Sequence, residues 1–124
     1  MTWITLFVVI GLLAVFFVIR QMSLISPDSA RGYLKEGAIV VDVRSPSEYD
    51  SGHLRGTVNL PMVELSARIG KVCPDKNRFI LLHCLSGGRS GMAVGILKSL
   101  GYAKAYNLGS YSRAEGILAG AQGK

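Results

Sequence analysis

The strongest constraint on the fold is an apolar run, Phe79–Leu82, that passes through a short glycine-containing loop into a helical pattern. The run contains no glycine or proline, which is typical of a buried strand. Apolar side chains then recur at helical spacing between Met92 and Leu100, and Gly101 follows as a helix stop. A strand that enters a helix through a short loop predicts an α/β sheet, and such sheets place their ligand sites at the carboxyl ends of the strands.

The loop between these two elements, His83–Ser90, reads His-Cys-Leu-Ser-Gly-Gly-Arg-Ser. Gly87 and Gly88 permit positive φ angles, so successive backbone N–H groups can point inward, and the start of the helix adds positive potential. A thiol held in such a cradle ionises more easily, and the thiolate is the nucleophilic form. Cys84 is therefore the predicted catalytic residue. The alternative interpretation of the loop is a buried cysteine that does no chemistry.

Arg89 is the second unusual feature of the loop. The first turn of a helix is stabilised by acidic side chains, whereas here a cation is present and no acid occurs from His83 to Leu100. A planar guanidinium matches an oxyanion, so Arg89 is predicted to bind an anion, with a merely solvated arginine as the alternative. The residues predicted to bind substrate are Leu85, Ser86, Gly87, Gly88, Arg89 and Ser90.

A second informative stretch, Asp42–Pro61, follows a predicted strand at Ala38–Val41. Its segment Ser45–Glu48 has the form of a capping box, in which the serine caps a helix and the glutamate reaches back. The predicted main role of Glu48 is therefore helix capping. Arg44 lies close enough in sequence to pair with Glu48, which is its predicted partner.

Together the two motifs resemble the rhodanese family of sulfurtransferases. Cys84 opens a six-residue loop that ends at Arg89, as in single-domain rhodaneses, whereas the loop of related dual-specificity phosphatases and arsenate reductases is one residue longer. Thr57 stands where the family usually has alanine. The residues that match the other family motif in order are Asp42, Val43, Arg44, Glu48, Tyr49, Gly52, His53, Leu54, Gly56, Asn59 and Pro61.

The resemblance implies a three-layer α/β/α domain on a five-stranded parallel sheet. It also implies a sulfurtransferase reaction in which Cys84 takes a sulfane sulfur from thiosulfate or another sulfane-sulfur donor, such as a persulfide. The cysteine persulfide then passes the sulfur to a thiol or cyanide acceptor, with Arg89 holding the oxyanion. No metal or organic cofactor is expected. Two alternatives remain: a phosphatase or arsenate reductase of the same fold, and a membrane-tethered rhodanese-like binding module without catalysis.

The amino-terminal segment differs in character from the rest of the chain. From Trp3 to Ile19 it is apolar apart from Thr5 and Gly11, and every charged side chain lies at Arg20 or later. No basic residue precedes the run, which argues against a signal peptide, and its length of roughly 26 Å is at the short end for a bilayer. We therefore predict one transmembrane helix as a single-pass membrane anchor. The basic residues after the run predict a cytoplasmic catalytic domain.

The predicted organisation has four parts: a transmembrane anchor at 1–20, a linker at 21–26, a rhodanese-like domain at 27–119 and a frayed tail at 120–124. Within the domain the basic residues are scattered and are not interleaved with aromatic ones. The net charge of +6 therefore predicts attraction to anionic lipids and anionic sulfur donors, and no nucleic-acid partner.

Overall fold

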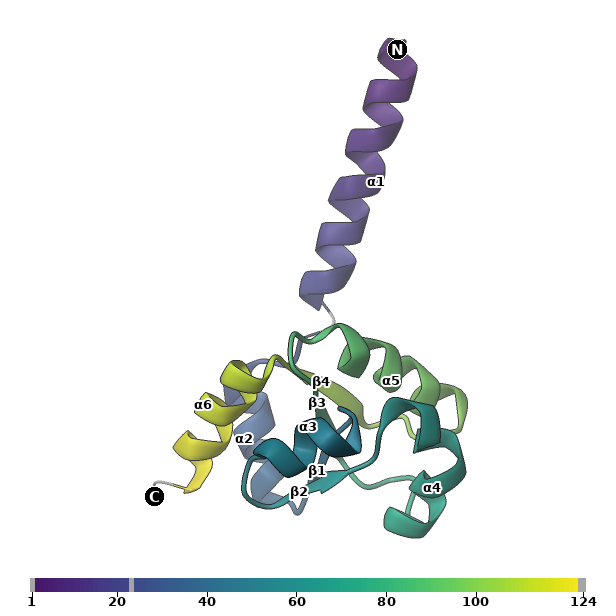
Figure 1. Cartoon of the computed structure of the whole chain (residues 1–124). Helices are drawn as coiled ribbons and strands as arrows, with labels where there is room; N and C mark the ends of the chain where they lie inside the picture. Colours follow the sequence, from purple (N-terminus) through teal and green to yellow (C-terminus); the bar gives the residue numbers. More distant parts are fainter. Residues whose placement is uncertain (1, 23, 123–124) are drawn as a thin grey trace.

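The computed structural model describes residues 2–22 and 24–122, and in this part of the chain a parallel sheet of four strands lies between two layers of helices (Figure 1). The strand order is β2-β1-β3-β4, and all neighbouring strands pair in parallel. The strands are β1 (Ile39–Asp42), β2 (Thr57–Asn59), β3 (Ile80–His83) and β4 (Ala105–Gly109). The helices are α1 (Trp3–Met22), α2 (Pro27–Lys35), α3 (Pro46–Ser51), the 3-10 helix η1 (Met62–Glu64), α4 (Leu65–Val72), α5 (Gly88–Ser99) and α6 (Tyr111–Gln122).

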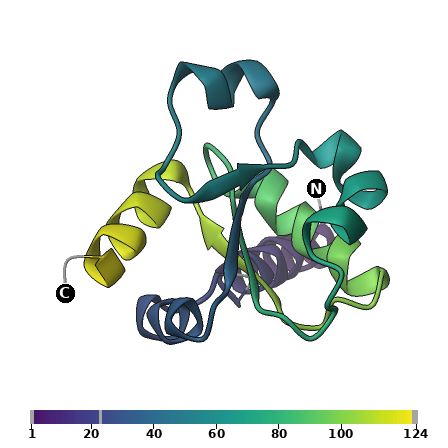
Figure 2. The ribbon, with the colours of Figure 1, turned by 90° about the horizontal axis from the view of Figure 1, so that it is seen from below.

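The two helical layers cover opposite faces of the sheet (Figure 2). On central strand β3, Leu82 packs on the side of α4 and α5, with Leu65 and Leu97, whereas Leu81 packs on the side of α2 and α6, with Leu108. Successive side chains of a strand point to opposite faces, so a strand covered on both faces must be apolar throughout. The apolar run of β3 is thus explained by the helices that cover both faces of the sheet, which is the predicted three-layer α/β/α architecture.

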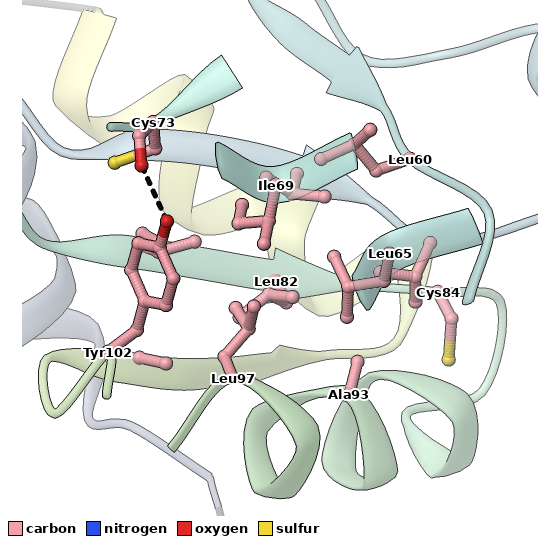
Figure 3. Close-up of a cluster of buried hydrophobic side chains, with 13 residues drawn as sticks. Leu60, Leu65, Ile69, Cys73, Leu82, Cys84, Ala93, Leu97 and Tyr102 are labelled. Atoms are coloured by element: carbon pink, nitrogen blue, oxygen red, sulfur yellow. Dashed lines mark hydrogen bonds between the residues drawn. The ribbon is translucent and has the colours of Figure 1, made fainter. Parts of the chain in front are cut away.

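The core on the α4 and α5 side extends to the nucleophilic loop. Figure 3 shows Leu82, Leu65 and Leu97 packed together, with Cys84 at the end of the same cluster. Since these side chains are fully buried, the base of the cysteine is anchored in close-packed surroundings. The sheet and α5 therefore position the thiol rigidly.

The sheet has one strand fewer than predicted. Beside β4, the described residues form only an isolated parallel bridge, between Leu24 and Asn107, and no fifth strand. Ile25 N donates to Asn107 O at 3.0 Å, but Ser26 then caps α2 and Pro27 has no N–H to donate. The chain thus turns into a helix before a ladder can form, and the prediction of five strands is wrong.

The predicted transmembrane anchor is not supported. A helix, α1, forms over Trp3–Met22 and extends away from the sheet (Figure 1). Across residues 2–22 and 24–122, no helix combines the length and the apolar character that crossing a bilayer requires. The apolar run ends at Ile19, and its length of roughly 26 Å is below the ~30 Å of a typical hydrocarbon core. The cytoplasmic placement of the catalytic domain, which rests on the residues flanking this run, stays a prediction.

The carboxyl-terminal helix is longer than the sequence indicates. Ser110 caps α6 by accepting a hydrogen bond from Arg113 N at 3.1 Å, and Ile117 and Leu118 are buried against the sheet. The helix continues through Gln122, so residues 120–122 of the predicted tail are helical. Residues 123–124 of that tail lie outside the described residues.

Candidate active site

Cys84 lies directly after β3, at the carboxyl end of a central strand, and its side chain is buried. The loop that follows brings the Gly87 N–H to 3.0 Å from the Cys84 sulfur. Gly87 has a φ of +98°, whereas Gly88 begins α5 with ordinary helical geometry. A side chain at Gly87 would be strained because this φ lies in the left-handed region, although its Cβ would lie only in ordinary contact, at 3.4 Å, with the backbone of Gly109. The predicted inward amide is confirmed at Gly87, and only one of the two glycines needs a positive φ.

The environment of Cys84 favours the thiolate. Burial by itself raises the pKa of a thiol. The Ser90 hydroxyl and the backbone N–H groups of Ser90, Gly87 and Ser86 stabilise the thiolate, and their combined effect outweighs burial. The pKa of Cys84 is therefore lowered, which increases the fraction of the nucleophilic form at neutral pH.

The other cysteine, Cys73, has the opposite environment. Its side chain is buried, and the Tyr102 hydroxyl donates to Cys73 O at 2.7 Å (Figure 3). Burial raises the pKa of Cys73, an effect that Arg78 only partly offsets. Cys73 is thus a packing residue with a neutral thiol, and it is free rather than disulfide-bonded.

Asn107 completes the cradle from β4 and was missed in the sequence. Its Oδ1 lies 2.7 Å from Ser90 Oγ and accepts from Gly109 N at 2.8 Å, while its Nδ2 donates to Gly87 O at 3.2 Å. Ser90 Oγ also lies 3.5 Å from Cys84 Sγ, 3.2 Å from Gly87 O and 3.5 Å from Gly109 O, so the sulfur competes with the Asn107 oxygen and two backbone carbonyls for one hydroxyl proton. The sequence did contain a signal for this role: Asn107 is the only amide side chain within the largely apolar strand β4.

We expect Ser90→Ala to raise the pKa of the Cys84 thiol and to lower kcat/KM for sulfur transfer at neutral pH by about fivefold. The hydroxyl favours the thiolate. A full hydrogen bond to a charged group contributes about 1.5–3 kcal/mol, and we expect a smaller effect here because other acceptors compete for the same proton. The thiolate forms as pH rises, so the ascending limb of the pH profile of kcat/KM shifts to higher pH in the variant. Ser99→Ala, on the exposed end of the same helix, is the control. An unshifted profile in Ser90→Ala contradicts this role.

Leu85 and Ser86 join the loop to the start of α6. Tyr111 N donates to Leu85 O at 3.1 Å, and Ser86 forms an antiparallel bridge with Ser110. The Leu85 side chain is exposed. These contacts fix the loop, which connects β3 to α5, against the segment between β4 and α6. The substrate-binding role assigned to the loop residues stays a prediction.

Arg89 is paired with an acid from the second sequence motif. Its Nη1 lies 2.7 Å from Glu48 Oε1 and its Nη2 lies 3.0 Å from Glu48 Oε2, in a bidentate arrangement. Ser45 caps α3 and exchanges both capping-box hydrogen bonds with Glu48, so the predicted capping role of Glu48 is confirmed. The same carboxylate therefore caps a helix and neutralises the loop arginine, a double role that the sequence did not reveal.

Arg44 does not pair with Glu48 as predicted, because a nearer carboxylate is buried beside it. Arg44 Nη2 lies 2.7 Å from Asp42 Oδ2 and 2.8 Å from the Gly52 carbonyl, and Arg44 Nε lies 3.0 Å from Asp42 Oδ1. The hydrogen bonds that Arg44 donates to the Asp42 carboxylate raise the pKa of Arg44. This buried ion pair joins the end of β1 to the turn after α3 and holds the second motif in place.

His83 lies between this ion pair and the nucleophile. Its Nδ1 lies 3.1 Å from Cys84 O, and its Nε2 lies 3.7 Å from Asp42 Oδ2. Within the described part of the chain, no atom hydrogen-bonds to this buried Nε2. Burial lowers the pKa of His83, so the imidazole is neutral at physiological pH. Its position favours support of the loop backbone over proton transfer.

A buried thiol with a lowered pKa, placed at the end of a central parallel strand and facing the amides of a loop that opens a helix, defines a cysteine-dependent group-transfer site. The comparison with protein families agrees with this geometry, since the rhodanese-like domain matches residues 26–114. The chain therefore belongs to the rhodanese-like family.

Several of the similar proteins are named as sulfurtransferases. The thiosulfate sulfurtransferase PspE of Escherichia coli is 39% identical over 69 residues, which are 56% of this chain and 66% of that protein. A structure of an Escherichia coli rhodanese with anions is 35% identical at a TM-score of 0.60, over 62% of this chain and 91% of the other. The human single-domain sulfurtransferase TSTD1 is 28% identical at a TM-score of 0.63, over 74% of this chain and 94% of the other. The chain is thus a transferase of the rhodanese type.

Proposed function

We propose that this protein moves a sulfane sulfur from a small donor to a thiophilic acceptor through a persulfide on Cys84. The observation that carries the proposal is the cradle of the thiol: the Gly87 N–H lies 3.0 Å from the sulfur, and the Ser90 hydroxyl lies at 3.5 Å. The names of the similar proteins support sulfur transfer as the class of reaction.

The reaction has two displacement steps. In the first, the Cys84 thiolate attacks the outer sulfur of the donor; a sulfur–sulfur bond forms to Cys84, the donor's sulfur–sulfur bond breaks, and its electron pair leaves on sulfite or on a thiolate. In the second, cyanide or an acceptor thiolate attacks the terminal sulfur, and the Cys84 thiolate leaves. The groups that lower the pKa of Cys84 also make it a better leaving group in this second step. No proton transfer by His83 is required.

The alternative of a phosphatase or arsenate reductase is less well supported by the same loop. Only four residues separate Cys84 from Arg89, which limits the number of backbone amides available to an oxyanion. Glu48 also neutralises the arginine that a phosphate dianion would need. Both features suit the transfer of a single sulfur atom better.

Intact-mass measurement of the full chain after exposure to thiosulfate tests the proposal. We expect a gain of one sulfur atom in the unmodified protein, no gain in Cys84→Ala, and loss of the added mass after cyanide treatment. Failure to gain sulfur from thiosulfate or from any persulfide donor contradicts the proposal. Hydrolysis of an aryl phosphate without any sulfur adduct would instead select the phosphatase alternative.

A further inference from the structure

Glu48 and Arg89 form the one ion pair, among the described residues, that connects the nucleophilic loop to the second motif. Both oxygens of Glu48 are used, at 2.7 and 3.0 Å. This end-on arrangement occupies both terminal nitrogens of the guanidinium, which form one of the two edges with which an arginine can bind an oxyanion. The pair therefore decides how much positive charge the loop presents to an incoming donor.

Glu48 is held in place independently of Arg89. Its Oε1 accepts hydrogen bonds from Ser45 N at 3.1 Å and from Ser45 Oγ at 3.0 Å, within the capping box of α3. The Arg89 hydrogen bonds, followed by that of the Ser45 backbone, lower the pKa of Glu48 to about 2. The carboxylate is thus held in place and is charged throughout the neutral range of pH. The ion pair with Arg89 therefore persists when a sulfur donor enters the site, because Glu48 does not become protonated.

The charge balance at the nucleophile follows from these contacts. The Arg89 guanidinium is close enough to the Cys84 thiolate for their charges to interact. The thiolate and Glu48 each carry one negative charge and Arg89 carries one positive charge, so the three groups together are negative. An incoming dianion is repelled by this sum more strongly than a monoanion of the same shape. Without the Glu48 charge, the sum would be neutral.

We infer that Glu48 is a specificity-determining residue that turns the site away from dianionic donors and toward sulfane donors with a single negative charge, such as alkyl persulfides and thiosulfonates. This inference rests on the proposed function, since it concerns the donor that charges Cys84 with sulfur. It names the substrate class that the loop favours and assigns the second sequence motif a part in the reaction.

Thiosulfate and methanethiosulfonate provide a matched pair of probes, because a methyl group in the second replaces one oxyanion of the first. With either probe, the Cys84 thiolate attacks the outer sulfur, the probe's sulfur–sulfur bond breaks, and the electron pair leaves on sulfite or on methanesulfinate. We expect Glu48→Gln to raise the ratio of kcat/KM for thiosulfate to that for methanethiosulfonate by about fivefold, the size expected for one unit charge near a partly solvated site.

The control is Asp50→Asn, which removes one negative charge from an exposed position of the same helix. We expect the ratio to stay within about twofold of its original value, since an exposed charge is screened by solvent. An equal change in Asp50→Asn and Glu48→Gln, or no change in either, overturns the inference. Reporting a ratio removes any general loss of activity that a loosened loop causes in both reactions.

Two further variants test the same idea if Glu48→Gln alone does not fold. We expect Arg89→Gln to lower the ratio, because Glu48 is then uncompensated. The double variant Glu48→Gln/Arg89→Gln restores it to near the original value, because both charges are gone and an amide pair can still hydrogen-bond. A double variant whose ratio equals that of Arg89→Gln shows that Glu48 has no effect on donor choice.

The two levels of proposal fail in different ways. If neither probe adds sulfur to Cys84 in the unmodified protein, the proposed function is wrong. If both probes add sulfur and the ratio is insensitive to Glu48, sulfur transfer stands and only the role of Glu48 is wrong.

Discussion

Cys84→Ser is expected to lower sulfur-transfer turnover by at least a factor on the order of a thousand, the largest effect of any single substitution in the domain. The Gly87 amide and the Ser90 hydroxyl favour a thiolate, but a serine hydroxyl remains protonated in the same surroundings, and its oxygen cannot accept and release a sulfane sulfur. The measurement is the rate of thiocyanate formation from thiosulfate and cyanide, together with the intact mass of the protein.

Cys73→Ser is the matched control for this prediction. Cys73 is also buried, but its pKa is raised by burial and it packs with Tyr102 in the core. We expect its variant to lose some stability and to keep kcat/KM within about twofold at temperatures where it is folded. Loss of persulfide in Cys73→Ser and its retention in Cys84→Ser would transfer the nucleophilic role to Cys73.

The second large effect is expected on stability. Asp42→Asn should lower the free energy of unfolding by about 3–5 kcal/mol, because it leaves the buried Arg44 guanidinium without its carboxylate partner. Both side chains are nearly or fully buried, with Asp42 fully inaccessible and Arg44 6% exposed. The shift in the midpoint of urea unfolding of the full chain, with an unchanged slope, measures the effect.

Asp28→Asn provides the same chemical change at the surface. Asp28 lies 3.9 Å from Arg31 in an exposed pair, and such pairs contribute between about 0 and 1 kcal/mol. We expect its unfolding midpoint to stay close to that of the unmodified protein. Equal midpoints for Asp28→Asn and Asp42→Asn would show that the Asp42–Arg44 pair does not stabilise the fold.

Features with a local cause were predicted correctly from the residues. The capping box at Ser45, the turn at Gly87 and the apolar run of β3 each depend on interactions among a few neighbouring positions. The position of Cys84 at a strand end follows from the same local pattern. The two errors in architecture also have local causes: Pro27 ends the expected fifth strand, and the apolar amino-terminal run is short for a bilayer.

The partners of the charged side chains were not predictable in this way. Arg44 has Asp42 and Glu48 at similar separations in sequence, and only the burial of Asp42 beside it in the fold decides between them. Glu48 and Arg89 are 41 positions apart, and Ser90 and Asn107 lie on different elements. Long-range pairs of this kind depend on strand order and on the crossing of helices over the sheet.

The amino-acid sequence by itself determined that a thiol would lie at the carboxyl end of a buried strand, facing the amides of a glycine turn, because periodicity and turn chemistry act over a few residues. Only the tertiary structure decided how charge is distributed around that thiol. It brings Glu48 from the second motif onto Arg89, and Asn107 from the edge strand onto Ser90. Electrostatic and hydrogen-bond energies depend on the distance between groups and on their burial. For these pairs, distance and burial are set only once the fold brings the two motifs together.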